Sequence, residues 1–174
     1  ERIDHPAVRL VHAIDDAAPY LAAPFEQANF GFYSQTLRGQ KEMLPRWKRV
    51  LGAVNSELGM ALGELYVAKA FPPEAKARAM DLVNNVQAAL KTHIENLDWM
   101  SDATKVKAME KWSTFLPKIG YPEKWRDWSG LSLGDGGFFA DVMATTKFNY
   151  DYDIAKIGKP TDRKDWGMTP QTVN

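Results

Sequence analysis

The sequence is short of three things, and each shortage narrows what the protein can do. It has no cysteine, only three histidines among 174 residues, and no excess of either charge, with 22 basic and 22 acidic side chains. Without cysteine there is neither a disulfide nor a thiolate metal site, although export remains compatible with the sequence. A neutral balance gives no overall attraction to nucleic acid or to an anionic membrane.

Long apolar runs are also missing. No stretch approaches the ~20 apolar residues that span a bilayer, and no signal peptide is visible. The first residue is Glu1 rather than Met, which is typical of a processed or cloned segment. With 45% hydrophobic and 25% charged residues, the composition is that of an ordinary globular protein. A chain of this length is expected to bury roughly 70% of its unfolded surface and to form a sizeable core.

Apolar residues recur every three or four positions along most of the chain, which predicts a mainly α fold. The spacing, with its flanking prolines and glycines, places helices over residues 6–18, 24–37, 44–70, 73–96, 101–116 and 138–157. Residues 125–137 are predicted to be loop, and Met168 to Val173 are compatible with a short strand. We therefore expect a multi-helix, bundle-like arrangement.

Three of these helices carry specific local predictions. Ser101 is a good N-cap for the helix that follows it. In the helix over 44–70, Gly52, Gly59 and Gly63 each cost about 1 kcal/mol relative to alanine, which suggests that another element approaches closely there. The helix over 73–96 has a predicted core-facing stripe made of Ala75, Ala79, Leu82, Val83, Val86, Leu90, Ile94 and Leu97.

The histidines do not form a recognisable zinc motif. A zinc peptidase helix needs two histidines four positions apart with a glutamate between them, whereas His5, His12 and His93 are separated by seven and eighty-one positions. His12 with Asp15 or Asp16 is a conceivable weak metal site, but an ordinary surface histidine is the favoured reading. No Ser-His-acid arrangement can be assembled either.

Other local patterns also favour ordinary structural roles. Asn149, Asp151 and Asp153 mimic the first ligands of a calcium loop, but Ile154 and Pro160 stand where that loop needs glycine and glutamate. Residues 134–137 are glycine-rich but lack the strand and the Lys-Ser or Lys-Thr of a phosphate loop, which favours a flexible turn.

Two clusters could serve binding. The basic segment at residues 46–49 contains Trp47, but a helix would point its members in different directions, and we expect Trp47 in the apolar stripe rather than on nucleic acid. The last third of the chain is rich in aromatic residues, which could line a sugar- or peptide-binding groove but are more simply explained as core or interface. They are Trp125, Trp128, Phe138, Phe139, Tyr150, Tyr152 and Trp166.

Several short segments, in a fixed order, resemble the neprilysin and endothelin-converting-enzyme family of zinc metallopeptidases. The resemblance covers most of the chain from Leu44 onward and has the look of a bacterial exported member without cysteines. The segments are Pro45 to Arg49, Ala61 to Val67 with Ala70-Phe71, Leu97 to Met100, Ala103 to Lys105, Lys118 to Pro122, Asp165-Trp166 and Thr172 to Asn174.

The resemblance implies a two-lobed peptidase in which a helical cap lobe limits a reaction chamber to peptides. It implies that residues 1–160 belong to the cap and that residues 161–174 connect to a catalytic lobe outside this chain, where zinc, its ligands and the catalytic residues lie. Asn174 would hold the substrate backbone. The chain alone would then be inactive and bind no zinc. Its partners would be peptide substrates and the catalytic lobe, in the periplasm or outside the cell.

Two further possibilities remain open at this point. The first is a free-standing helical binding module that uses the aromatic residues of the last third. The second is self-association, since apolar stripes left without their partner elements would be exposed.

Overall fold

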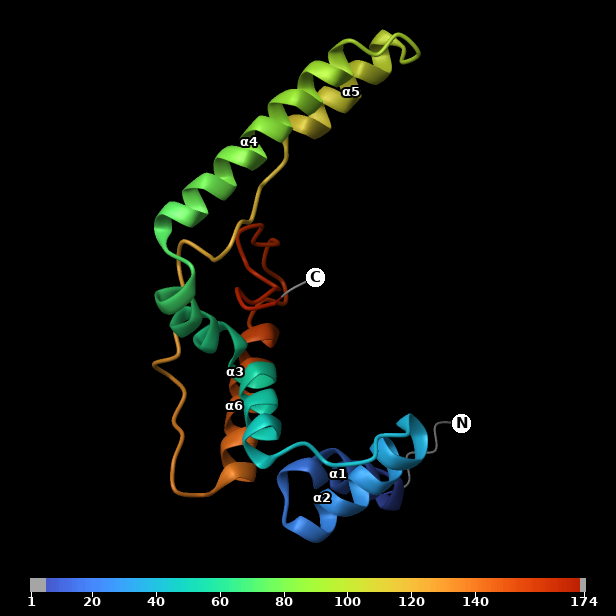
Figure 1. The fold of residues 1–174 in the computed structure, drawn as a ribbon, viewed down its shortest axis with the longest axis vertical. Coiled ribbons are helices and arrows are strands. Elements are labelled where there is room, and N and C mark those ends of the chain that lie inside the picture. Colours follow the sequence, from blue (N-terminus) through green and yellow to red (C-terminus); the bar gives the residue numbers. More distant parts are fainter. Residues whose placement is uncertain (1–5, 173–174) are drawn as a thin grey trace. The chain divides into compact units, whose positions relative to one another are not determined.

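A computed structural model describes residues 6–172, and this part of the chain is mainly α-helical and forms no strand, which confirms the predicted fold class. Figure 1 shows the order of the helices along the chain. The α-helices are α1 (Pro6–Ala17), α2 (Ala23–Asn29), α3 (Arg46–Ala70), α4 (Pro73–Glu95), α5 (Asp102–Ser113) and α6 (Phe138–Ile154), with a short 3-10 helix η1 (Ala18–Tyr20) and a π-helix η2 (Phe30–Thr36).

Contacts between Cα atoms divide the chain into two compact units. The first contains the described residues up to Gly59 together with Asp127–Lys159, and the second contains Met60–Arg126 together with the described residues from Pro160 onward. The chain passes between the units three times. One passage lies inside α3, which contributes residues to both.

In the first unit, α6 packs against the N-terminal part of α3. The side-chain amide of Asn149 donates to the backbone carbonyl of Glu57 at 2.9 Å. Trp128 stacks on Phe148 with 5.5 Å between ring centroids. Near the start of α6, Phe138 meets the edge of the Tyr20 ring at 5.7 Å. These contacts join segments that are far apart in the sequence.

In the second unit, α4 and α5 form an antiparallel helical hairpin (Figure 1). The indole N–H of Trp112 donates to the carbonyl of Gln87 at 2.9 Å, and the Lys105 ammonium donates to the carbonyl of Glu95 at 3.1 Å. Ser101 caps α5 by accepting the backbone N–H of Thr104 at 3.3 Å. The predicted N-cap is therefore confirmed.

The segment after α5 is held against the start of α4. Gly120 turns with a φ of +72° and lies against the ring of Phe71. The next residue, Tyr121, meets Phe71 edge to face at 5.8 Å and stacks on Trp125 at 6.1 Å. The ammonium group of Lys76 lies over the Tyr121 ring at 4.2 Å.

The expected C-terminal strand is wrong for the residues that the structure describes. Met168 to Thr172 form turns, with the Thr172 N–H donating to the carbonyl of Thr169 at 3.0 Å. Pro170 has no backbone N–H to donate to the hydrogen-bond ladder of a β-sheet. It lies beside Gly63 of α3. Val173 lies outside the described residues.

The expectation of a sizeable core is also wrong for the described part of the chain. The hydrophobic residues that are buried there are Ala18 and Val142. Surface-to-volume scaling assumes one compact domain, whereas this chain forms two units with helices covered on one side. On α4, the predicted stripe is split: Val83 is half-buried beside α5, but Leu82 and Val86 are 65% and 60% exposed.

Candidate functional site

The first unit contains an open hollow of about 270 Å³ between η1, α2, η2, α3 and the start of α6. Its lining is mixed, with apolar side chains beside polar and charged groups. The described residues around it are Pro19, Tyr20, Glu26, Asn29, Phe30, Ser34, Met43, Arg46, Arg49, Val50, Gly52, Ala53, Ser56 and Phe138.

An ion pair organises the polar side of this hollow. Nε of Arg49 lies 2.8 Å from Oε1 of Glu26, and both side chains are largely shielded from solvent. The Arg49 guanidinium also donates to the carbonyl of Leu44, just before α3 begins. The pair therefore joins α2 to α3, and its charges are already compensated. This arrangement can contact a small polar or apolar group. Among the described lining residues there is no histidine, and the carboxylate of Glu26 is paired with Arg49.

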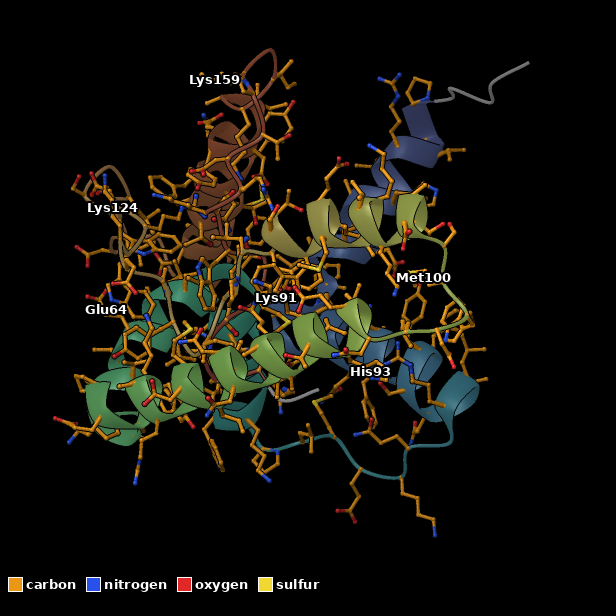
Figure 2. All side chains as sticks on the ribbon, turned by 90° about the horizontal axis from the view of Figure 1, so that it is seen from above. Glu64, Lys91, His93, Met100, Lys124 and Lys159 are labelled. Carbon is orange, nitrogen blue, oxygen red and sulfur yellow. The ribbon has the colours of Figure 1, made fainter. Side chains whose placement is uncertain are left out.

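The described residues do not provide a zinc site. No group of three His, Asp or Glu side chains close enough to hold a metal ion occurs between residues 6 and 172. His12 lies on α1, and His93 lies near the C-terminal end of α4 (Figure 2). Asp15, the suggested partner of His12, instead accepts the hydroxyl of Tyr33. That hydrogen bond raises the pKa of Tyr33.

The calcium-like residues are placed on a helix rather than in a loop. Asn149, Asp151 and Asp153 all lie on α6. Asp151 pairs with Lys147 one turn earlier, and Asp153 pairs with Lys156 at 2.9 Å. The glycine-rich segment likewise ends as a turn, in which Gly137 precedes α6 with a φ of +83°. Both patterns therefore have the structural roles that the sequence favours.

The predicted position of Trp47 in the apolar stripe of α3 is wrong. The Trp47 side chain is 63% exposed, and the ammonium of Lys48 lies over its ring, 5.4 Å from the centroid. Trp47 lies in the first turn of α3, on a side of the helix that is open to solvent.

The aromatic residues of the last third belong to separate clusters within the two units. Trp128 stacks on Phe148 in the first unit, and Trp125 stacks on Tyr121 in the second. Phe138 is the member of the set that appears among the lining residues of the hollow. Tyr150 is exposed. Ring contacts give Trp125, Trp128 and Phe138 packing roles, whereas Phe139 and Tyr152 are exposed like Tyr150.

Asn174, the residue predicted to contact substrate, lies outside the described residues.

The sequence did not reveal two polar clusters that the structure brings together, one around Lys76 and one around Glu57. Lys76 donates to the Tyr121 carbonyl at 2.7 Å and pairs with Glu123 at 2.8 Å. Both clusters join residues far apart in the chain, so no spacing pattern could have shown them.

Comparison with known proteins gives a consistent result. The family model described as peptidase family M13 matches residues 7–122. Neprilysin-3 of Drosophila melanogaster is 28% identical over 161 residues, covering 88% of this chain and 20% of its own length. Human endothelin-converting enzyme 1 is 26% identical over 162 residues, covering 89% of this chain and 21% of its own length.

Solved structures of similar fold also belong to metalloproteases or carry related names. The zinc metalloprotease Zmp1 of Mycobacterium tuberculosis in its open state is 42% identical, with a TM-score of 0.84 over 92% of this chain and 25% of that one. PepO of Lactobacillus rhamnosis is 28% identical, with a TM-score of 0.80 over 92% of this chain and 26% of that one. The chain thus spans about a fifth of the length of these curated relatives and about a quarter of the solved structures.

Proposed function

The chain belongs to peptidase family M13, and on that premise we propose that it is the non-catalytic helical cap portion of a zinc metalloendopeptidase. The resemblance to neprilysin and endothelin-converting enzyme is confirmed at the level of the family. In this proposal the complete protein hydrolyses peptide bonds in small peptides, and the cap restricts access to the chamber in which hydrolysis occurs.

The proposal rests on one observation, namely which portion of a family member this chain corresponds to. The family model matches residues 7–122, and 92% of the chain aligns with a quarter of a solved zinc metalloprotease. The described residues contribute helices and no group of three metal-binding side chains. Zinc and the residues that activate water would then belong to the rest of the polypeptide. No catalytic step is assigned to the residues described here.

The proposal also divides the chain. Residues 1–160 belong to the cap, residues 161–174 lead toward the catalytic lobe, and Asn174 contacts the backbone of a bound peptide. We further propose that the complete protein works outside the cytoplasm, which rests on the family alone. Among the described helices, none has the length and the apolar character that a membrane crossing needs.

A peptidase assay on the purified 174-residue chain tests the first part. An internally quenched peptide is incubated with the chain and added zinc, and we expect no cleavage above the zinc-only control. Cleavage that depends on zinc and stops on addition of a chelator would overturn the proposal that this portion is non-catalytic.

A chimera tests the role in substrate access. The segment of Zmp1 that aligns with this chain is replaced by this chain, which has a similar fold there. We expect the chimera to cleave a short quenched peptide while leaving the same site uncut in a folded protein. Unmodified Zmp1 is assayed on the same two substrates as the control. If the chimera cleaves both substrates equally and unmodified Zmp1 does not, the access role is contradicted.

A further inference from the structure

The hollow of the first unit is formed in part by an unusual element. Residues Phe30–Thr36 form the π-helix η2, and π-helical turns are rare and occur frequently at functional sites. Two residues of η2, Phe30 and Ser34, line the hollow. A π-helix bonds residues five positions apart, so positions four apart lie on nearly the same side of it. The wide turn therefore brings one apolar and one polar side chain to the same space.

Much of the lining is apolar. The rings of Tyr20 and Phe138 meet edge to face with 5.7 Å between their centroids, and both side chains are half-buried. Phe30, Met43 and Val50 are half-buried as well. Aromatic rings offer flat apolar contact area, and methionine adapts to irregular gaps. The hollow suits one small apolar group, because its volume of about 270 Å³ lies below the roughly 300–1,000 Å³ of sites for larger ligands.

The polar part of the lining has hydrogen-bonding capacity to spare. Four polar side chains make no hydrogen bond and no ion pair within residues 6–172, namely Asn29, Ser34, Arg46 and Ser56. Asn29 and Ser34 are half-buried, so water reaches them only in part. An amide and a hydroxyl each donate and accept, and half-buried groups of this kind gain from a ligand that bonds to them.

The charges around the hollow favour an anion with a single negative charge. Glu26 and Arg49 pair at 2.8 Å and compensate each other, which leaves Arg46 as the uncompensated charge among the described lining residues. A guanidinium can bind a carboxylate through two parallel hydrogen bonds. A phosphate dianion would bring a second negative charge that this lining does not balance. Arg46 is exposed, so a carboxylate bound to it stays partly hydrated.

We propose that the hollow is a binding site for a small monocarboxylate that carries one apolar group. The carboxylate binds Arg46, and the apolar group enters between the half-buried rings. Two sources share this chemistry, namely the last residue of a peptide, whose amide also meets the unpaired polar side chains, and a free aromatic or aliphatic acid. The described lining residues all belong to the first unit, so binding does not depend on the complete protein being a peptidase.

Titration of the isotope-labelled chain with phenylpropionate, followed by nuclear magnetic resonance, tests the site. We expect saturable shifts with a dissociation constant on the order of 1 mM, as befits a ligand of so few atoms. Ring protons of the ligand should show nuclear Overhauser effects to the methyl group of Met43. The uncharged phenylpropionamide should bind about tenfold more weakly, because it lacks the charge that pairs with Arg46. Equal affinity for acid and amide, or shifts that do not saturate, would overturn the proposal.

A second ligand distinguishes the two sources. N-acetyl-phenylalanine has the same ring and carboxylate as phenylpropionate and adds the amide group of a peptide. Tighter binding of this compound identifies a peptide C-terminus as the source, because the added amide reaches Asn29, Ser34 or Ser56. Equal or weaker binding identifies a free acid. Both results support a monocarboxylate site, and they differ in the natural ligand that they assign to it.

Two matched variants test the role of Arg46. Arg46→Gln removes the charge and keeps good helix propensity, so the affinity for phenylpropionate should fall about tenfold. Lys48→Gln removes a positive charge from the same turn of α3, but Lys48 does not line the hollow, so the affinity should not change. Equal losses in the two variants would contradict a specific contact with Arg46. The comparison of acid and amide on the unmodified chain decides the question even if a variant does not fold.

Discussion

Gly120 shows how a single residue ties the end of the α4–α5 hairpin to the rest of its unit. Its φ of +72° lies in the left-handed region, which favours glycine over residues with a side chain. A Cβ atom placed there would lie 2.2 Å from Cε1 of Phe71, so the ring would have to move. Both the backbone and the packing therefore require glycine at this position.

We predict that Gly120→Ala lowers the free energy of unfolding of the second unit by about 2 kcal/mol, since left-handed backbone alone costs roughly 1–2 kcal/mol for alanine. Urea unfolding followed by tryptophan fluorescence measures the change. Gly167→Ala, in the same unit, is the control, because a Cβ there meets nothing within 4 Å. Equal effects of the two variants would refute the explanation.

The contact between Lys76 and Glu123 gives a prediction about pH. The hydrogen bond from Lys76, together with the attraction of its positive charge, lowers the pKa of Glu123 from its ordinary value of 4.5. A carboxyl with a lowered pKa in the folded state stabilises the fold above its unfolded pKa. This contribution is lost as pH falls below about 4.5 through the folded pKa.

We therefore expect the titration midpoint of Glu123, followed by carbon chemical shift, to lie below that in the variant Lys76→Met. Glu123 is largely exposed, so the associated change in stability is small. A midpoint in the unmodified chain that equals or exceeds that of Lys76→Met would show that the ion pair does not persist in solution.

At the scale of the elements, α3 contains two glycines with opposite expected behaviour. A Cβ at Gly63 would lie 2.5 Å from Cδ of Pro170, whereas a Cβ at Gly52 meets nothing within 4 Å. The predicted close approach of another element is therefore confirmed at Gly63 and wrong at Gly52. Of these two glycines, Gly63 has a packing reason to be glycine.

We predict that Gly63→Ala destabilises the fold by about 1–3 kcal/mol, because Pro170 must move to make room. Gly52→Ala should stabilise it by up to about 1 kcal/mol, because alanine is the better helix former. Thermal unfolding followed by circular dichroism compares the two variants. A stabilising effect of Gly63→Ala would mean that the segment around Pro170 does not pack on α3 in solution.

The elements also show which features the sequence could reveal. The cap at Ser101 depends on neighbouring residues, so a local pattern predicted it. The hydrogen bond from Asn149 to the carbonyl of Glu57 joins residues about ninety positions apart, and no periodicity contains that information. The segment around Pro170 forms turns beside Gly63 instead of the expected strand, and this long-range contact is likewise absent from local patterns.

At the scale of the whole molecule, the apolar faces are more numerous than the elements available to cover them. Sequence periodicity predicted a core-facing stripe on α4, but it could not show that part of this stripe would remain exposed. Leu82, Val86 and Leu90 recur every four positions on the uncovered edge and are all exposed. The family relatives are four to five times longer than the matched segment. Apolar periodicity predicts that a face is buried, but it does not tell whether the element that covers this face belongs to the described residues.

This uncovered edge leads to a prediction about the isolated chain. Exposed apolar patches promote association, so we expect the average mass from light scattering to rise with concentration. Replacing Leu82, Val86 and Leu90 together by glutamine should return the chain to a monomer, since glutamine keeps good helix propensity while removing the apolar surface. The control replaces Ala77 and Ala88, exposed elsewhere on α4, by glutamine and should leave association unchanged. If the control variant dissociates equally, or if the unmodified chain is monomeric at high concentration, this edge of α4 does not drive association.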